Sequence, residues 1–175
     1  MVAWKGGSIL KVGRAWRPPM VKRLRRAYLS EPVGRSPTAK STAVSKSMRS
    51  NVASGTRPEL LLAKYLRKRL RKTDLVGRPD FVYPKQRVAV FVHGCFWHRC
   101  PVDASPVPRT HAAFWRRKFA RNVERDRLNR EELGSMGWKV VELWEHEVRS
   151  DPRACAKRVL SQVRVGTREA GSVYA

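Results

Sequence analysis

Apolar residues recur at helical spacing in three parts of the chain, which predicts three main helices. Thr56 can cap the first of these helices, which would carry Pro58 and Glu59 in its first turn and would end near Lys72. The other two expected helices are a long one from about Ala112 to Ser135 and a last one that begins at Pro152, after a cap at Ser150 or Asp151.

Three shorter apolar runs predict β-strands at residues 81–83, 87–92 and 139–144. The middle run is almost continuously apolar, which is typical of a strand that is buried on both faces. Residues 93–110 are rich in Gly, Pro, Cys and His and are expected to form an irregular loop. This order of elements predicts an α/β fold, with a small mixed β-sheet flanked by helices.

The first part of the chain has a different character. Residues 1–46 contain eleven Lys and Arg and one acid, and they show no sustained periodicity, so we expect a disordered basic arm. Residues 47–165 are expected to form one folded domain, and residues 166–175 a flexible tail.

Charge and cysteine content narrow the class of protein. The chain has 38 Lys and Arg against 14 Asp and Glu, a net charge of +24, which points to a polyanionic partner: nucleic acid first, an anionic membrane surface second. No apolar run approaches the ~18 residues of a membrane-spanning helix. Three cysteines are too few for a disulfide-stapled scaffold and suggest metal ligands or buried thiols.

Asp80 is the first candidate for chemistry, because it stands where a chain break meets an apolar strand. A carboxylate at the margin of a core needs a cation or hydrogen-bond donors to stay charged. It could be a Mg²⁺ ligand, since Mg²⁺ binds to few carboxylates and keeps several waters. Alternatively, it is a turn aspartate that caps the amides of the strand.

A second candidate is the segment with Cys95, His98 and Cys100, whose side chains could supply three zinc ligands. His146 is the best remote fourth ligand, and Cys155 is the reserve. Metal binding would help to order a loop with little apolar content. The alternative is a loop that carries two reduced thiols.

Aromatic and polar side chains near this loop suit contact with nucleic acid. Phe96 and Trp97 lie inside the loop and Trp115 opens the long helix, and such rings beside many arginines can stack on bases or wedge between them. Asn122 and Asp126 are four residues apart on the long helix and share a face. The alternative interpretation is that the rings are core residues and that the helix presents a solvated charged face.

Together these motifs resemble the very short patch repair (Vsr) endonucleases over roughly residues 46–150. The most specific strings are Gly-Cys-Phe-Trp-His at 94–98 and Asn-Val-Glu-Arg-Asp-Arg at 122–127, and Gly-Arg-Pro-Asp-Phe-Val at 77–82 adds to them. The resemblance implies a restriction-endonuclease-like fold of the PD-(D/E)xK superfamily. It also implies an enzyme that nicks double-stranded DNA next to a T·G mismatch.

The resemblance further implies roles for individual residues. Asp80 would be the essential Mg²⁺-binding aspartate, with the backbone carbonyl of Val92 as a second ligand. His93 would lie at the scissile phosphate, Asp126 would be the acidic partner of a catalytic histidine, and Glu59 would be an active-site glutamate on the first helix. The remaining implied roles are zinc ligation by Cys95 and Cys100, intercalation by Phe96, Trp97 and Trp115, and DNA contacts by Asn122 and Arg49.

The zinc segment departs from the family pattern, which has a longer spacing and separate histidines for catalysis and for zinc. Here His98 alone remains: counted from Trp97 it would be catalytic, and counted back from Cys100 it would be a zinc ligand. We favour zinc, because a structural site with three ligands would be left open. In that case His93 with Asp126, or a Mg²⁺-bound hydroxide, must activate the water. His146 stands where the family usually has cysteine, and zinc accepts either.

The sequence therefore suggests a Mg²⁺-dependent DNA mismatch endonuclease with structural Zn²⁺, acting as a monomer on a T·G duplex. Its expected place is the bacterial cytoplasm with the nucleoid, with mismatch-repair proteins as further partners and no membrane. Two alternatives are a non-catalytic zinc-containing DNA-binding protein and a basic RNA-binding protein. Asp80, Glu59 and Asp126 favour the enzyme, because a simple polyanion binder gains nothing from acids that face a phosphate.

Overall fold

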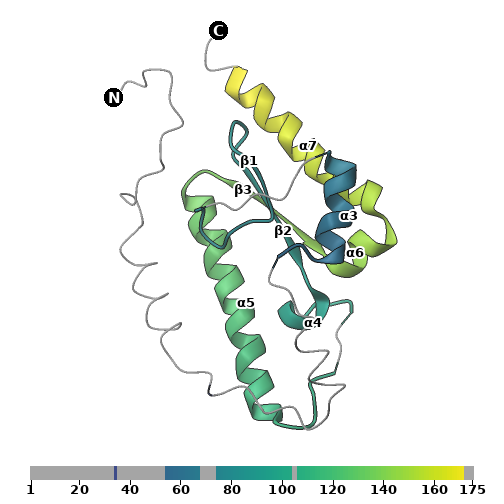
Figure 1. The fold of residues 1–175 in the computed structure, drawn as a ribbon. Helices are drawn as coiled ribbons and strands as arrows, with labels where there is room; N and C mark the ends of the chain where they lie inside the picture. Colours follow the sequence, from purple (N-terminus) through teal and green to yellow (C-terminus); the bar gives the residue numbers. More distant parts are fainter. Residues whose placement is uncertain (1–33, 35–53, 68–73, 104–105, 172–175) are drawn as a thin grey trace.

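The computed structural model describes residues 34, 54–67, 74–103 and 106–171 (Figure 1). Apart from residue 34, the predicted basic arm lies outside the described residues, as does Arg49. The elements in chain order are α3 (Arg57–Leu66), β1 (Phe81–Tyr83), β2 (Val88–His93), α4 (Cys95–His98), α5 (Ala112–Ser135), β3 (Lys139–Trp144), α6 (Glu145–Ser150) and α7 (Pro152–Gly171).

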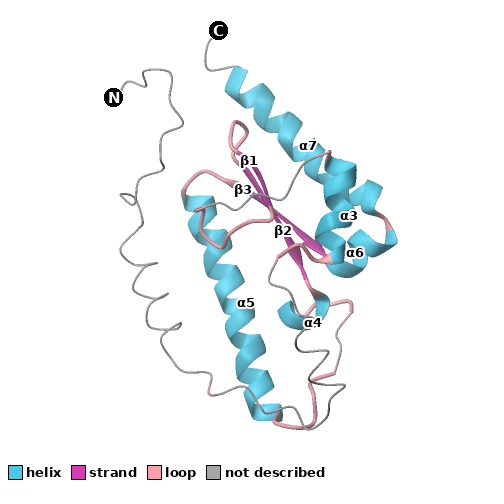
Figure 2. Ribbon diagram, viewed as in Figure 1, coloured by secondary structure: helices cyan, strands magenta, loops and turns pink. Residues whose placement is uncertain are grey.

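The described strands form one mixed sheet in the order β1-β2-β3. β1 runs antiparallel to β2, and β2 runs parallel to β3. Figure 2 shows α5 on one side of the sheet and α3, α6 and α7 on the other. The predicted α/β architecture, a small mixed sheet flanked by helices, is therefore confirmed.

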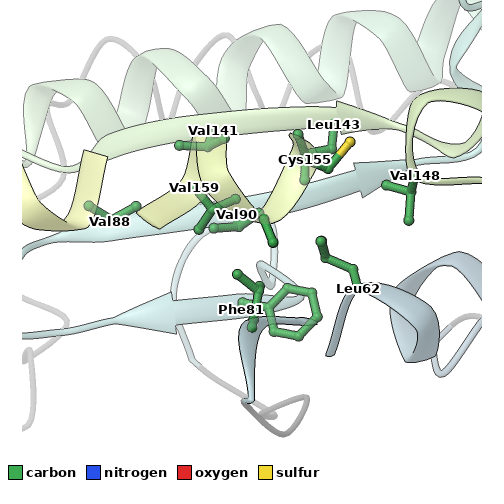
Figure 3. Close-up of a cluster of buried hydrophobic side chains, with 11 residues drawn as sticks. Leu62, Phe81, Val88, Val90, Val141, Leu143, Val148, Cys155 and Val159 are labelled. Carbon is green, nitrogen blue, oxygen red and sulfur yellow. The ribbon is translucent and has the colours of Figure 1, made fainter. Parts of the chain in front are cut away.

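Strand β2 is apolar throughout because both of its faces are covered. Val88 and Val90 point into the larger core cluster, between the sheet and helices α3 and α7, while Ala89 points into a smaller cluster with Val76 and Leu133. Figure 3 shows most of the larger cluster, labelled at Leu62, Phe81, Val88, Val90, Val141, Leu143, Val148, Cys155 and Val159.

Helix α3 begins as predicted and ends earlier than predicted. The Thr56 hydroxyl accepts from the Glu59 amide, and the Glu59 carboxylate accepts from the Gly55 amide at 2.7 Å, so the first turn is capped in both directions. Arg67 follows the helix in the left-handed conformation, with φ 50°, and closes it at Leu66. The expected end near Lys72 is therefore wrong.

The segment expected to be an irregular loop is partly regular. His93 is the last residue of β2, and residues 95–98 form the short helix α4, which Arg99 ends in the left-handed conformation. Arg87 also has a positive φ of 51° and belongs to the turn before β2 rather than to the strand. A tight exit from the strand therefore brings the Cys and His residues of this segment back beside the sheet.

Two helices follow β3, where one was expected. Helix α6 was not predicted, and Ser150 ends it instead of capping the next helix. Asp151 is the cap, because its carboxylate accepts from the Ala154 amide at 2.8 Å, and Pro152 is the first residue of α7. Helix α7 continues to Gly171, beyond the expected domain boundary at residue 165. No helix in the described part of the chain is both long enough and apolar enough to cross a membrane.

The turn before β1 fixes the position of the next acidic residue. Gly77 has φ +75°, and a Cβ there would lie 2.8 Å from the Asn129 side-chain nitrogen, so helix α5 leaves no room for a larger residue. Pro79 is fully buried just after this turn. The chain therefore enters β1 at Asp80 along one defined path.

Truncation to alanine should have different effects at two leucines of α3 that differ in burial. Leu62 is fully buried in the larger cluster and Leu60 is 51% exposed. We expect Leu62→Ala to lower the free energy of unfolding by about 2–5 kcal/mol and Leu60→Ala by less than about 1 kcal/mol. Urea denaturation followed by circular dichroism measures both, and equal losses would contradict this packing.

Candidate active site

The carboxyl end of β2 opens into a cleft of about 1270 Å³. Helix α3, the turn before β1, helix α4 and one face of α5 all contribute to its wall, and Figure 1 shows α4 at this end of the sheet. Four sequence-predicted residues, Glu59, Asp80, His93 and Asp126, all line it, although they are far apart in the sequence. The fold thus brings the predicted acids and a histidine together.

Asp80 is held at the edge of the sheet by backbone contacts. Its carboxylate accepts from the Val92 amide at 2.7 Å, and its own amide donates to the Val90 carbonyl at 2.9 Å. Burial, together with the nearby Glu59 carboxylate, raises the pKa of Asp80 to about 7. Two neighbouring carboxylates in a confined site are a suitable place for a divalent cation with oxygen ligands.

His93 is buried at the end of β2 and faces α5. Its Nε2 lies 3.1 Å from a carboxylate oxygen of Glu142, on the neighbouring strand β3. The other oxygen of Glu142 accepts from Arg130 at 2.5 Å. The hydrogen bond from His93, helped by Arg130, lowers the pKa of the Glu142 carboxyl. Glu142 is therefore a charged acceptor that orients the His93 ring.

His98 lies at the end of α4, and its Nδ1 donates to the Asp126 carboxylate of α5. The rings of His98 and His93 lie 4.5 Å apart between centroids. One ligand atom each from His93, His98 and Asp126 lie within 4.8 Å of one another. An imidazole held by a carboxylate in an open cleft can accept or pass on a proton.

Cys95, Cys100 and His146 form a separate group that does not line the cleft. The Cys95 sulfur lies 3.2 Å and the Cys100 sulfur 3.5 Å from Nδ1 of His146, and all three ligand atoms lie within 4.8 Å of one another. The Asp103 amide donates to the Cys100 sulfur at 3.3 Å. Burial raises the pKa of the Cys95 thiol to about 11, so a bound cation would be needed to hold a thiolate there. Two thiols and an imidazole are a donor set that fits zinc.

The structure places His98 with the cleft residues rather than with the two cysteines. Within the described residues, the groups that could hold a metal separate His98 and Asp126 from Cys95 and Cys100. This position favours the catalytic alternative for His98 over the zinc-ligand alternative that we preferred from the sequence. It also makes His98, rather than His93, the hydrogen-bond partner of Asp126.

The predicted aromatic residues form one cluster between α4 and α5. The ring centroid of Phe96 lies 5.0 Å from those of Trp97 and Phe119, and the centroids of Trp97 and Trp115 lie 6.0 Å apart. Trp97 lines the cleft. The Asn122 amide donates to the Trp97 carbonyl at 3.0 Å and so fastens α4 to α5. The packed rings therefore hold Trp97 in place in the cleft, next to His98.

Basic side chains line the cleft together with the acids. The lining includes Arg57, Arg78, Lys118, Arg125 and Arg149. Positive charge around a negative centre suits a polyanionic ligand whose backbone is guided toward a bound cation.

Sequence reasoning missed two acids of the site. Glu142 orients His93, and Glu145 accepts from the Cys95 amide at 3.3 Å. The signal for Glu142 was present, because period-2 alternation puts it on the opposite face of β3 from the buried Val141 and Leu143. Helix α5 packs against β3, so a charged side chain on this partly covered face needs a partner.

Known proteins match a large part of this chain, including several residues of the cleft. A family model described as DNA mismatch endonuclease Vsr matches residues 38–102. The type II nicking enzyme V.NaeI of Lentzea aerocolonigenes is 40% identical over 132 residues, which cover 70% of this chain and 79% of that protein. The type II nicking enzyme V.NmeAIP of Neisseria meningitidis is 39% identical over 114 residues, or 62% of this chain and 81% of that protein. DNA mismatch endonuclease Vsr of Escherichia coli is 42% identical over 90 residues, or 51% of this chain and 58% of that protein. On this similarity, the chain belongs to the Vsr family of DNA mismatch endonucleases and is a DNA endonuclease.

Proposed function

We propose that this protein nicks one strand of double-stranded DNA beside a T·G mismatch, by Mg²⁺-dependent hydrolysis of a phosphodiester bond. One observation carries the proposal: the partly buried Asp80 carboxylate and the His98–Asp126 pair line one cleft, together with several basic side chains. A protein that only binds nucleic acid gains nothing from these acids. The Escherichia coli relative is named a DNA mismatch endonuclease, which supports mismatched DNA as the substrate class.

Asp80 and the backbone carbonyl of Val92 would hold the Mg²⁺ ion. The donor set fits, because a carboxylate and a carbonyl leave most of the coordination shell to water and to substrate phosphate. When bound, Mg²⁺ would withdraw negative charge from the phosphate and lower the pKa of the attacking water. The raised pKa of Asp80 supports this role, since a nearby cation would relieve the cost of keeping the carboxylate charged.

His98 and His93 would have different roles in the reaction. His98, held through Nδ1 by Asp126, has Nε2 left to take a proton from the attacking water. His93 donates through Nε2 to Glu142 and, with both ring nitrogens protonated, would donate through Nδ1 to a phosphate oxygen. Arg57, Arg78 and Lys118 would bind the phosphates on either side.

Recognition of the mismatch would depend on the aromatic cluster. A ring that enters a base step must unstack it, and this costs least where the pairing is already weak. Trp97 is the ring that lines the cleft beside His98, and Phe96 and Trp115 support it from behind. A T·G pair would therefore be selected in part by its deformability.

The direct test is a nicking assay on a labelled duplex with one T·G pair, compared with the T·A duplex of the same sequence. We expect one cut strand with Mg²⁺, no cut with EDTA, and little cutting of the T·A duplex. Binding that is equally tight for both duplexes, with no cut in Mg²⁺, would favour a non-catalytic DNA-binding protein. Tighter binding to RNA would favour the third alternative.

Trp97→Ala should weaken the preference for the mismatch. Loss of a stacked ring costs about 1–3 kcal/mol, so we expect the T·G over T·A ratio of kcat/KM to fall by about tenfold. Tyr65→Ala is the matched control, because Tyr65 is 43% exposed on α3 and does not line the cleft. If the two variants discriminate equally well, Trp97 is not the mismatch sensor.

Cys95, Cys100 and His146 would hold a structural Zn²⁺. When bound, Zn²⁺ would cross-link α4 to α6 and so hold the cleft wall in place. We further propose that residues 47–165 form a restriction-endonuclease-like domain that works as a monomer in the bacterial cytoplasm with the nucleoid. Contact with mismatch-repair proteins belongs to the same proposal.

A further inference from the structure

We propose that His93, His98 and Asp126 form a transition-metal site, distinct from the cysteine site, and that Zn²⁺ bound there blocks nicking. Only the blocking of nicking rests on the proposed function. The binding of the metal rests on the geometry of three side chains and can be tested alone.

The three residues already form a ligand set. One ligand atom from each lies within 4.8 Å of the others, although the residues come from β2, α4 and α5. Two imidazoles and one carboxylate are a donor set that Zn²⁺, Co²⁺ and Ni²⁺ accept. All three residues line the cleft, so an ion could enter from solvent and keep a water or substrate ligand.

The surroundings support the ring of His93 as they do in metal sites. Nε2 of His93 lies 3.1 Å from the Glu142 carboxylate, which leaves Nδ1 of the same ring for a metal. Histidine ligands in metal sites commonly donate their other ring nitrogen to a carboxylate or carbonyl. Arg130 holds the second oxygen of Glu142, so this support is itself fixed.

The site should discriminate against Mg²⁺. Mg²⁺ prefers oxygen ligands and octahedral geometry, whereas two of the three donors here are imidazole nitrogens. Asp80, with its carboxylate and the Val92 carbonyl, has the opposite preference. The cleft would therefore hold two neighbouring sites for two classes of ion.

Occupation would remove the groups that the reaction needs. A metal held by Nδ1 of His98 and by Asp126 replaces the hydrogen bond between them. The neutral ring then carries its proton on Nε2, so Nε2 can no longer take a proton from water. Because the block acts through nitrogen ligands, raising the Mg²⁺ concentration should relieve it weakly. Zinc that displaced Mg²⁺ at Asp80 would instead be relieved in proportion to Mg²⁺.

The first experiment is a Co²⁺ titration of the purified full-length protein, followed by absorption spectroscopy and equilibrium dialysis. Co²⁺ on thiolates gives sulfur-to-metal charge-transfer bands, whereas Co²⁺ on imidazole and carboxylate does not. We expect one equivalent of Co²⁺ that binds without charge-transfer bands. Absence of this equivalent in the wild-type protein would overturn the proposal.

Variants locate the equivalent within the cleft. We expect Asp126→Asn and His98→Gln each to lower the affinity of this site for Co²⁺ by at least about tenfold. Glu131→Gln, an exposed acid on the same helix, should leave it within about twofold of wild type, since the loss of one surface charge acts weakly. If Asp126→Asn fails to fold, His98→Gln decides. If this Co²⁺ ion no longer binds to Asp80→Asn but still binds to Asp126→Asn, the ion lies at Asp80 and the proposal is overturned.

A nicking assay at fixed Mg²⁺ with increasing Zn²⁺ then tests the block. We expect inhibition in parallel with occupation of the cleft site, and little relief by extra Mg²⁺. Relief in proportion to Mg²⁺ would contradict the block and leave the binding result standing. A protein that binds Co²⁺ as described and does not nick DNA would fail the proposed function without failing the metal site.

Discussion

Asp80→Asn is expected to abolish nicking, with a loss of at least about 1,000-fold in kcat, because the cation that polarises the phosphate would lose its carboxylate ligand. Affinity for the T·G duplex should stay within about threefold of wild type, since the arginines around the cleft are untouched. Single-turnover nicking and filter binding separate the two quantities. Loss of binding together with cutting would make Asp80 a binding residue rather than a catalytic one.

The same substitution should stabilise the protein when Mg²⁺ is absent. Burial raises the pKa of Asp80 from 3.8 to about 7, so the folded state holds this proton more tightly than the unfolded chain does. Protonated Asp80 therefore favours the folded state. Its contribution to the free energy of unfolding is full below about pH 4 and is lost as the pH rises through about 7. At about pH 8, Asp80→Asn should therefore be more stable by roughly 2–4 kcal/mol.

Denaturation at about pH 5 and about pH 8, without Mg²⁺ and without added chelator, measures this difference. The gain should be larger at the higher pH. Glu131→Gln removes an exposed acid outside the cleft and should change neither nicking nor this pH dependence. Equal stability of Asp80→Asn and wild type at both pH values would mean that the carboxylate is solvated in the free protein.

Local pattern was sufficient for the elements that bury a regular face. The apolar run of β2 and the α5 span from Ala112 to Ser135 could be predicted, because both faces of β2 are covered and the buried side chains of α5 recur at helical spacing. The shared face of Asn122 and Asp126 was also predicted from their spacing, and it is the face that contacts α4.

Features set by single backbone conformations could not be predicted in this way. Arg67 and Arg99 end their helices in the left-handed conformation, which arginine adopts rarely and which no spacing indicates. Helix α6 is only six residues long, too short for periodicity to separate from a loop.

The assignment of His98 illustrates where sequence spacing stops being informative. Its distance along the chain from Cys100 and from Trp97 allows either role. The choice depends on which neighbour α4 faces, and α4 presents Cys95 to α6 and His98 to α5. This orientation comes from tertiary packing, including the Asn122 contact to the Trp97 carbonyl, and is absent from any local pattern.

Cys100→Ser should both release the metal and weaken catalysis, and the connection between the two effects is helix α4. This helix has four residues, lies between Cys95 and Cys100, and carries Trp97 and His98. So short a helix is not stable by itself. Without the cross-link to His146, we expect His98 to lose its fixed position against Asp126, with nicking reduced by at least about 100-fold.

The same variant should lose several kcal/mol of unfolding free energy, since metal that binds only the folded state contributes its binding free energy to folding. Metal analysis, thermal melting and nicking are measured on one preparation. Cys155→Ala is the matched control. Cys155 lies on α7 and is buried in the larger core cluster, outside the group formed by the other two cysteines. It should keep the zinc and the nicking rate while losing about 1 kcal/mol of stability. If Cys100→Ser keeps full nicking activity after its zinc is gone, α4 is held by its packing against α5 and not by the metal.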